Sequence, residues 1–583
     1  MAQSRPDPDS HVNAVAFASG QLPEDEHLAA EAHLAGCQQC RAAVEAVREV
    51  AASQEDPNTR AVVSFVADLL VSTVVLIAPV ANQLSQPAPS AKKDRVPTEP
   101  LFFEPLRVLQ PRIKIGQHGM RRFIGRFGLV LFFTILVLLL PRPEGLSPAG
   151  HRALAAFVFT GSILALEPVS LPIAALMVPL ALVALNVADA TQAFETFSRP
   201  VVFLILASLF IAEGLRKHGL TRRLALQTLV AAGGKVPQVL LGIMLIAGLF
   251  SMWVENTATA AVLIPVALTV ASQIPNPDKA KGLLVLLVMG IAYSASLGGM
   301  ATIMGAGSNA VAAGFLQEIG TFSFVDWMIY GVPAFLIIFP ITWLLLLRLI
   351  SVSIDRIDLE PVRKQLKEMG PLSRAERELS LVMLVTIVLW VGGSFLEPAL
   401  RLPSTLLAPS MVAIMAVAYL AVRGILNWED VKGVSWGIFF LIGAGLALGA
   451  ALTRSGATDW LAGLISPLIS GPPLLISLML LIFISALLTN VMNNTTIAAV
   501  FVPILISLSL TDPTLNPVLL VLAATLATTF GYSLPSASGR MALVSASGII
   551  EPRDMMRYGL VATVISALIL GLFFFGLSAL NLI

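Results

Sequence analysis

ENTATAAVLIP (255–265) and NNTTIAAVFVP (493–503) are the two short stretches that decide how this chain folds. Each position of the first matches the position 238 residues later, so that Asn-Thr, Ala-Ala-Val and the final Pro coincide. Both place amide and hydroxyl side chains in the middle of long apolar runs. Interrupted helices persist in hydrocarbon only where they line a protein cavity. Because related breaks in two halves of a membrane protein indicate a transporter's binding site, we expect a transporter.

Composition supports a membrane location. Hydrophobic residues make up 56% of the 583 residues and charged residues 13%, about half the charged share of a soluble protein. The net charge of +1 gives no reason to expect direct nucleic-acid binding. The first ten residues, MAQSRPDPDS, contain no apolar run and do not predict a cleavable signal peptide. No nucleophile–base or phosphate-loop motif stands out, so we do not expect an enzyme.

We predict an all-α polytopic membrane protein with a small helical domain in front of it. The expected parts are a module over 1–60, a connector over 61–126, a first membrane helix with the first repeat over 127–353, and a second repeat over 354–583. Apolar runs predict spanning helices near 127–141, 150–166, 170–187, 200–217, 284–318 (broken), 327–350, 377–395, 406–424, 434–452, 517–545 (broken) and 557–580.

The segments 237–272 and 472–508 each have two apolar halves around a polar break, and each half is too short to span. We therefore predict two re-entrant hairpins with their tips at mid-membrane. With both hairpins entering and leaving on one side, the Lys- and Arg-rich loops fall on a single face, which places the N-terminus inside and makes the two repeats inverted.

Further matches support the repeat. LRKHG (215–219) precedes the first hairpin much as LTRSG (452–456) precedes the second, and AYS (292–294) and GYS (531–533) open two Gly- and Ser-rich breaks. The connector contains an apolar stretch, 61–81, in which Ser64, Asp68 and Ser72 recur every fourth residue. That stripe favours a helix lying in the membrane interface or on a partner over a spanning helix.

At this point residues 127–583 resemble the divalent anion/sodium symporter family, the sodium-coupled carboxylate and sulfate transporters. The resemblance rests on the two broken hairpins, on FSMWVENTAT (250–259) and on IAYSASLGGMAT (291–302). It implies eleven spans plus two hairpins, a homodimer in the bacterial inner membrane, and an elevator-like movement of a transport domain. It also implies Na⁺ as coupling ion and a small dianion as substrate.

The residues themselves suit such a site. Asn and Thr offer neutral donors to an anion, the restarting helices point N–H groups into the cavity, and sodium prefers oxygens. Carried over by motif, sodium would bind Ser251, Glu255, Asn256 and the backbone near Gly299 at the first tip, and Thr489, Asn493, Asn494 and the backbone near Ser533 at the second. The anion would face Asn256, Thr257, Asn494, Thr495, Pro535 and also Arg540.

The chain departs from the family pattern at Glu255 and Asn493, which replace tip serines, and at SGRM (538–541), where Pro-Pro-Asn is usual. Charges at membrane depth are candidates for function. Glu255 is expected to bind sodium, to carry a proton in its place, or to pair with Arg540. Arg540 is expected to clamp an oxyanion through its planar fork or to extend to the inner surface.

The N-terminal module has a zinc-like motif. His33, Cys37 and Cys40 have His-x3-Cys-x2-Cys spacing, which suits tetrahedral zinc, with His11 or, less well, His27 as fourth ligand. The segment 11–52 resembles a zinc-binding anti-sigma domain, which implies a cytoplasmic sigma-like partner. The alternative is a degenerate helical pair that binds no metal.

The functional prediction is secondary active transport of a small dianion. The second hypothesis is a receptor that senses an anion and signals through the zinc module.

Overall fold

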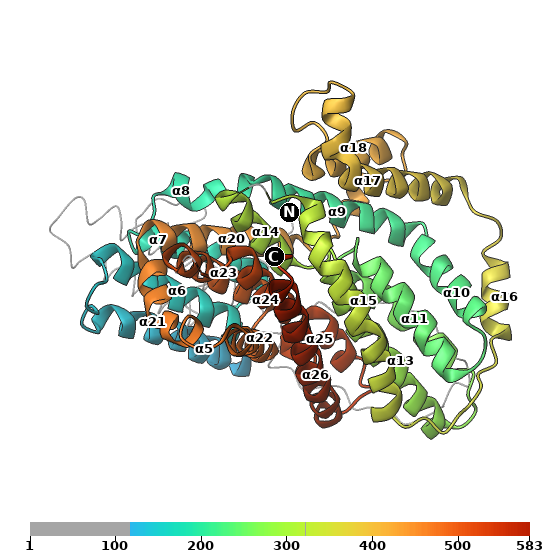
Figure 1. Ribbon diagram of the computed structural model, residues 1–583. Helices are drawn as coiled ribbons and strands as arrows, with labels where there is room; N and C mark the ends of the chain where they lie inside the picture. Colours follow the sequence, from blue (N-terminus) through green and yellow to red (C-terminus); the bar gives the residue numbers. More distant parts are fainter. Residues whose placement is uncertain (1–116, 321, 513) are drawn as a thin grey trace, which may run out of the picture. The chain divides into compact units, whose positions relative to one another are not determined.

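The computed structural model describes residues 117–583 except for 321 and 513, and it is built from helices (Figure 1). Within these residues an isolated bridge between Lys235 and Arg356 is the one β-type pairing. The predicted all-α membrane part is therefore confirmed. The module over 1–60, with His11, His33, Cys37 and Cys40, and the helix over 61–81 lie outside the described residues. Both stay predictions.

Ten helical elements of the first half recur in the same order in the second. After α5 (Gln117–Leu139), the first set comprises α6 (Pro148–Leu166), α7 (Leu171–Ala184), α8 (Ala190–Glu195), α9 (Pro200–Lys217), α10 (Leu220–Ala232), α11 (Val236–Ser251), α12 (Asn256–Ala271), α13 (Pro277–Gly299), α14 (Gly307–Ile319) and α15 (Phe324–Leu349). The second set comprises α17 (Arg374–Ala399), α18 (Pro409–Val422), α19 (Trp428–Val431), α20 (Trp436–Arg454), α21 (Ala457–Ile469), α22 (Leu474–Val491), α23 (Asn494–Thr511), α24 (Pro517–Ala527), α25 (Gly539–Ala546) and α26 (Pro552–Ala579). The short α16 (Glu360–Glu368) lies in the segment that joins the two sets.

The helix caps repeat as well as the helices. Gly219 and Gly456 precede α10 and α21 with φ of 72° and 74°, a left-handed conformation that favours glycine. Asn276 and Asn516 cap α13 and α24, each followed by Pro at the first helical position. The same local chemistry therefore starts corresponding helices in both repeats.

Both predicted hairpins are helix–break–helix units. In the first, α11 and α12 have 16 residues each, about 24 Å at 1.5 Å per residue, which is short of a hydrocarbon core of about 30 Å. In the second, α22 and α23 have 18 residues each, about 27 Å. The chain breaks at Met252–Glu255 in one and at Met492–Asn493 in the other.

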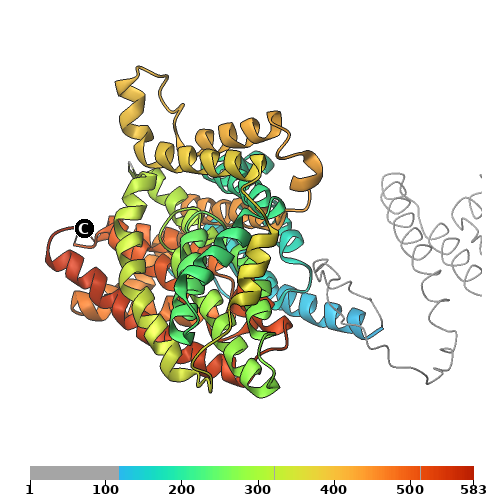
Figure 2. The ribbon, with the colours of Figure 1, turned by 90° about the vertical axis from the view of Figure 1, so that its right-hand side faces the viewer.

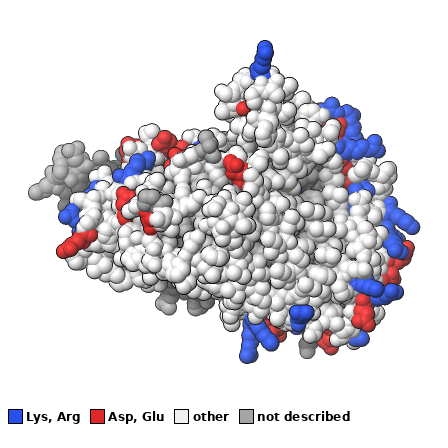
Figure 3. All heavy atoms as spheres, viewed as in Figure 1, with Lys and Arg blue, Asp and Glu red and all other residues white. Residues whose placement is uncertain are grey.

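Seven helices of the described chain are long and apolar enough to cross a membrane, or up to eight if the bent pair of Ala190–Ser198 and α9 is one span. They are α6, α13, α15, α17, α20, α23 and α26. This supports a polytopic membrane protein, whereas the eleven predicted spans stay a prediction. The counts differ because five predicted spans, α5, α7, α9, α18 and the broken α24, are not among the seven, whereas α23, predicted as half of a hairpin, is. Of these, α7 and α18 have only 14 residues each. Charged side chains concentrate toward the edges of the face in Figure 3, including the edge formed by α10 and α16.

Two broken helices pack against the hairpins. α13 ends at Gly299 and the chain resumes as α14 at Gly307, while α24 passes through η2 (Thr528–Phe530) and η3 (Pro535–Ala537) before α25. α11 and α12 contact α13, and α22 contacts α24 and η2. α14 and α25, the helices that follow the breaks, pack against hairpin helices of the opposite repeat, α23 and α12. Figure 2 shows the same helices from the side.

The segment between the repeats is fastened to the first repeat. Gly234 accepts from the Ile357 N–H at 2.8 Å and lies so close to the carbonyl of Ile357 that a Cβ would be 2.6 Å from its oxygen. Arg223 of α10 donates to Glu376 of α17 at 2.6 and 3.2 Å and to the Gly370 carbonyl at 2.7 Å. Both charged side chains are buried, at 6% and 3% exposure. We call the segment 350–372 the strap.

Candidate functional site

The first tip brings three oxygens, of Ser251, Ala295 and Gly305, around the side-chain amide of Asn256. The Asn256 side-chain oxygen lies 2.7 Å from Ser251 Oγ, and the Gly305 and Ala295 carbonyl oxygens lie 2.7 and 3.1 Å from the same amide position. If the amide is turned, its Nδ2 donates to all three. If its oxygen points inward, the four oxygens form the kind of ligand set that a hard cation binds. We call these atoms the first oxygen cluster.

Gly299 makes room for this cluster. A Cβ at this position would lie 2.8 Å from Asn256 Cγ and closer still to its side-chain oxygen. Asn309, from α14, donates its amide to the Gly299 and Thr302 carbonyls at 2.8 and 2.7 Å and so holds the broken backbone in place. The predicted grouping of Ser251, Asn256 and Gly299 is therefore present in space.

The second tip has a matching arrangement. Thr489 Oγ1 lies 2.7 Å from the Asn494 side-chain oxygen and 2.8 Å from the Thr528 carbonyl oxygen. Thr489 and Asn494 are five residues apart, like Ser251 and Asn256. A hydroxyl has one proton, so it cannot donate to both oxygens at once. We call these three atoms the second oxygen cluster.

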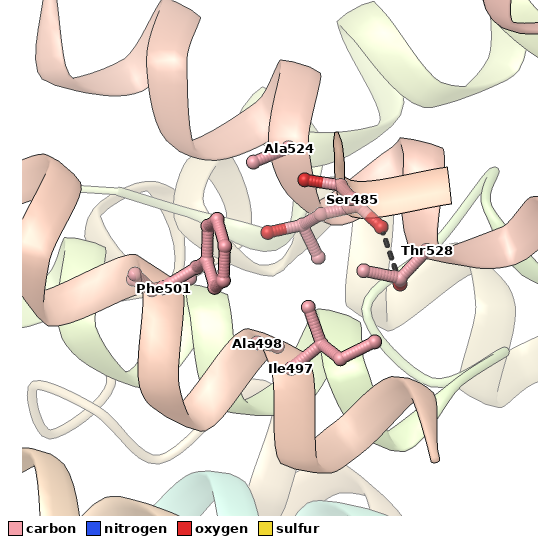
Figure 4. Close-up of a pocket in the computed structure, with 8 residues that line it drawn as sticks. Ser485, Ile497, Ala498, Phe501, Ala524 and Thr528 are labelled. Atoms are coloured by element: carbon pink, nitrogen blue, oxygen red, sulfur yellow. Dashed lines mark hydrogen bonds between the residues drawn. The ribbon is translucent and has the colours of Figure 1, made fainter. Parts of the chain in front are cut away.

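The wall behind the second cluster is tightly packed. Figure 4 shows Phe501 and Ile497 of α23 facing Ser485 of α22 and Ala524 of α24, with Thr528 beside them. Thr528 also donates its hydroxyl to the Thr525 carbonyl at 2.7 Å. The hollow has no room for a water molecule.

The two helix caps at the tips differ in charge. Glu255 caps α12 and accepts from the Thr257 and Ala258 N–H groups at 2.8 and 3.1 Å and from Thr257 Oγ1 at 3.0 Å. Asn493 caps α23 and accepts from the Thr495 N–H at 2.9 Å. At the two helix starts the caps therefore occupy the N–H groups of Thr257, Ala258 and Thr495.

Each tip also contacts the opposite repeat. A Cβ on Gly539 would lie 2.8 Å from Thr257 Oγ1, and one on Gly307 would lie 2.6 Å from Thr495 Oγ1. Tyr293 and Tyr532, which occupy matching positions in the two repeats, contact each other with ring centroids 4.2 Å apart and ring planes tilted by 31°. Thr257 and Thr495, which are both predicted to face the anion, therefore each lie against a glycine of the opposite repeat.

Arg540 is buried within the second break. Its side chain belongs to a residue only 2% exposed, and Nη2 donates to the Thr529 carbonyl at 3.0 Å. Nε has no hydrogen-bond partner among the described residues. The alternative in which Arg540 extends to the inner surface is therefore wrong. A direct ion pair with Glu255 is also absent from the salt bridges of the described chain.

The remaining predicted residues lie nearby. The Ser533 N–H donates to Asn490 Oδ1 at 2.9 Å, and Pro535 begins η3. Sequence reasoning missed Asn490 and Asn309, although both are amides inside apolar runs. It also missed the carbonyls of Ala295 and Gly305, since a sequence does not show where carbonyls point. Among the described residues no group of three or more His, Cys, Asp or Glu could hold a metal.

Comparisons with known proteins identify the family of this chain. Residues 121–577 match the family model described as "Sodium:sulfate symporter transmembrane region". The chain belongs to this family. An "Uncharacterized transporter" of Haemophilus influenzae is 31% identical over 452 residues, covering 76% of this chain and 94% of that protein. The "Sodium-dependent dicarboxylate transporter SdcS" of Staphylococcus saprophyticus is 28% identical over 471 residues, covering 76% and 89%.

Solved structures give a weaker likeness. The Alcanivorax borkumensis YdaH transporter has a TM-score of 0.44 at 15% identity and covers 80% of this chain and 98% of that one. Neisseria gonorrhoeae MtrF has a TM-score of 0.44 at 14% identity, with 79% and 95% covered. The family membership therefore comes from the sequence match, and it makes this chain a multi-pass membrane transporter rather than an enzyme.

Proposed function

We propose that the protein is a sodium-coupled symporter of a small dianion of the dicarboxylate or sulfate type. The family description and the name of the staphylococcal relative support both the ion and the class of substrate. The proposed setting is a homodimer in the bacterial inner membrane, surrounded by lipid, with the N-terminus inside. The proposed movement is elevator-like, with α11–α14 and α22–α25 shifting together against the remaining helices.

The observation that carries the proposal is the pair of oxygen clusters. Each combines a tip hydroxyl, a tip amide and carbonyls of a broken helix, and one comes from each repeat. Sodium binds hydroxyl, amide and freed backbone carbonyl oxygens of this kind. Glu255 directly precedes Asn256 in the chain, and its carboxylate accepts from the Thr257 and Ala258 N–H groups at the start of α12.

The anion has a different set of partners. Thr257 and Thr495 lie at the contacts between the repeats, and the Asn256 and Asn494 amides lie one residue before them. Arg540 adds a charged donor with an Nε–H that no described residue uses. Neutral donors with one guanidinium suit an anion better than two buried cations would, because each isolated buried charge is costly. Pro535 lies in the same break and completes the proposed set.

Uptake into liposomes tests this function. The purified protein is reconstituted, and entry of labelled succinate and labelled sulfate is followed with an inward sodium gradient or an equal potassium gradient. We expect sodium-dependent entry of one of the two anions. Asn494→Ala should abolish it, since that change removes the amide of the second cluster.

A matched control variant distinguishes loss of the binding site from loss of stability. Asn516→Ala removes an asparagine cap from α24, which costs about 1 kcal/mol of stability, but it leaves both tips intact. It should keep most of the uptake. Entry that ignores sodium, or normal uptake by Asn494→Ala, would contradict the proposal.

A further inference from the structure

Two charged residues, Glu255 and Arg540, have neutral counterparts in the other repeat. Their charges are opposite, and they belong to different tips. Glu255 lies next to Asn256 of the first cluster, and its counterpart at the second tip is the neutral Asn493. Arg540 lies in the second break, and its counterpart in the first break is the neutral Ser308, because GSNA (307–310) and GRMA (539–542) both begin a helix. The first cluster thus gains a negative charge and the second a positive one.

Arg540 binds the backbone that the second cluster needs. Its Nη2 donates to the Thr529 carbonyl, and the preceding carbonyl, of Thr528, is the backbone oxygen of the second cluster. In the first repeat the corresponding backbone support is neutral, since the Asn309 amide donates to Gly299 and Thr302. Thr528 and Thr529 are adjacent residues of the 3₁₀ turn η2, so the guanidinium binds the carbonyl next in sequence to the one in the second cluster.

The position of the Arg540 guanidinium makes binding of a second cation at the second cluster unfavourable. Arg540 keeps its charge, because a guanidinium stays protonated in proteins. Charges inside a protein are screened far less than in water, so the guanidinium repels a cation at the second cluster strongly. The negatively charged carboxylate of Glu255 favours a cation at the first cluster.

We propose that the Arg540 guanidinium takes the place of a coupling cation at the second tip, so that one sodium ion, bound at the first tip, accompanies each dianion. This inference rests on the proposed function, because it assigns the coupling ion of the same site. Arg540 is here a fixed counter-charge for the anion, and Glu255 is a positioning charge for the remaining sodium. The two clusters contain similar oxygen atoms, but sodium binds only the first.

The test is a flux ratio. Labelled sodium and labelled succinate or sulfate, whichever the protein accepts, are measured in the same proteoliposomes. We expect about one sodium per anion in the wild type and about two in Arg540→Ser, which restores the residue of the first repeat. Arg540→Lys keeps the charge and should keep the ratio near one.

The outcomes are distinguishable. A wild-type ratio of two, or an unchanged ratio in Arg540→Ser, overturns the inference but leaves the symporter proposal standing. Absence of sodium-driven uptake of either anion overturns the symporter proposal itself. If Arg540→Ser fails to fold, the ratios of the wild type and of Arg540→Lys decide, since a ratio of two in either contradicts a fixed counter-charge.

Discussion

Gly299→Ala is the sharpest probe of the first oxygen cluster. Gly299 is the last residue of α13, and an added Cβ would lie 2.8 Å from Asn256 Cγ and 2.9 Å from Nδ2. These separations are below ordinary van der Waals contact, so the amide has to move away from Ser251 and from the two carbonyls. The change therefore acts on the position of one sodium ligand.

We estimate the change in stability, which has two opposing contributions, separately from the change in sodium binding. Overpacking a buried position costs about 1–3 kcal/mol, and replacing Gly by Ala in a helix returns up to about 1 kcal/mol, so the net loss of stability lies between about 0 and 3 kcal/mol. Losing a hydrogen-bond-like contact to a charged group costs about 1.5–3 kcal/mol. That corresponds to an increase of about 10- to 150-fold in the sodium concentration for half-maximal uptake.

The assay is uptake as a function of sodium, together with thermal unfolding of the purified protein. Gly282→Ala is the matched control, because Gly282 lies in the same helix and its Cβ would meet only the Ser351 carbonyl at 3.5 Å. We expect Gly282→Ala to unfold at the same or a slightly higher temperature and to keep its sodium dependence. A wild-type sodium curve for Gly299→Ala would refute the assignment of Asn256 as a ligand.

Two further predictions concern charged residues. If Glu255 couples the ion, uptake should depend on both pH and sodium, and Glu255→Gln and Glu255→Ser should weaken both dependences; unchanged profiles in both variants would make Glu255 only the cap of α12 seen in its three hydrogen bonds. Arg223→Met should destabilise the protein by about 3–5 kcal/mol, because it leaves Glu376 buried and unpaired. Arg363→Met, at an exposed pair with 53% and 63% exposure, should change stability by less than about 1 kcal/mol, and equal shifts in unfolding temperature for the two variants would contradict the importance of the buried pair.

The sequence was informative wherever local chemistry determines structure. The 238-residue shift, the Gly219 and Gly456 starts and the two polar tips all predicted elements that the structure contains, because caps and breaks depend on a few neighbouring residues. Pairing Ser251 with Asn256 and Thr489 with Asn494 followed from the motif.

Long-range features were harder to predict. The contact of Tyr293 with Tyr532 and that of Thr257 with Gly539 depend on how the two repeats pack, which a repeat in sequence does not specify. Arg540 and Glu255 suggested a pair by charge alone, yet Arg540 binds a carbonyl and Glu255 binds its own helix. Opposite charges at similar depth were not enough to predict a contact.

The strap distinguishes α10 from its counterpart in the second repeat. The two repeats have equivalent helices, α10 and α21, but a single segment joins the repeats. The strap is attached to α10 and to the loop before α11, through the Arg223–Gly370 and Ile357–Gly234 hydrogen bonds. The corresponding position to Arg223 in α21 is Trp460, whose indole donates to the Glu144 carbonyl at 3.2 Å without an ion pair. The two helices are therefore held differently: α10 by a charged hydrogen-bond network to the joining segment, and α21 by an indole hydrogen bond to the loop before α6.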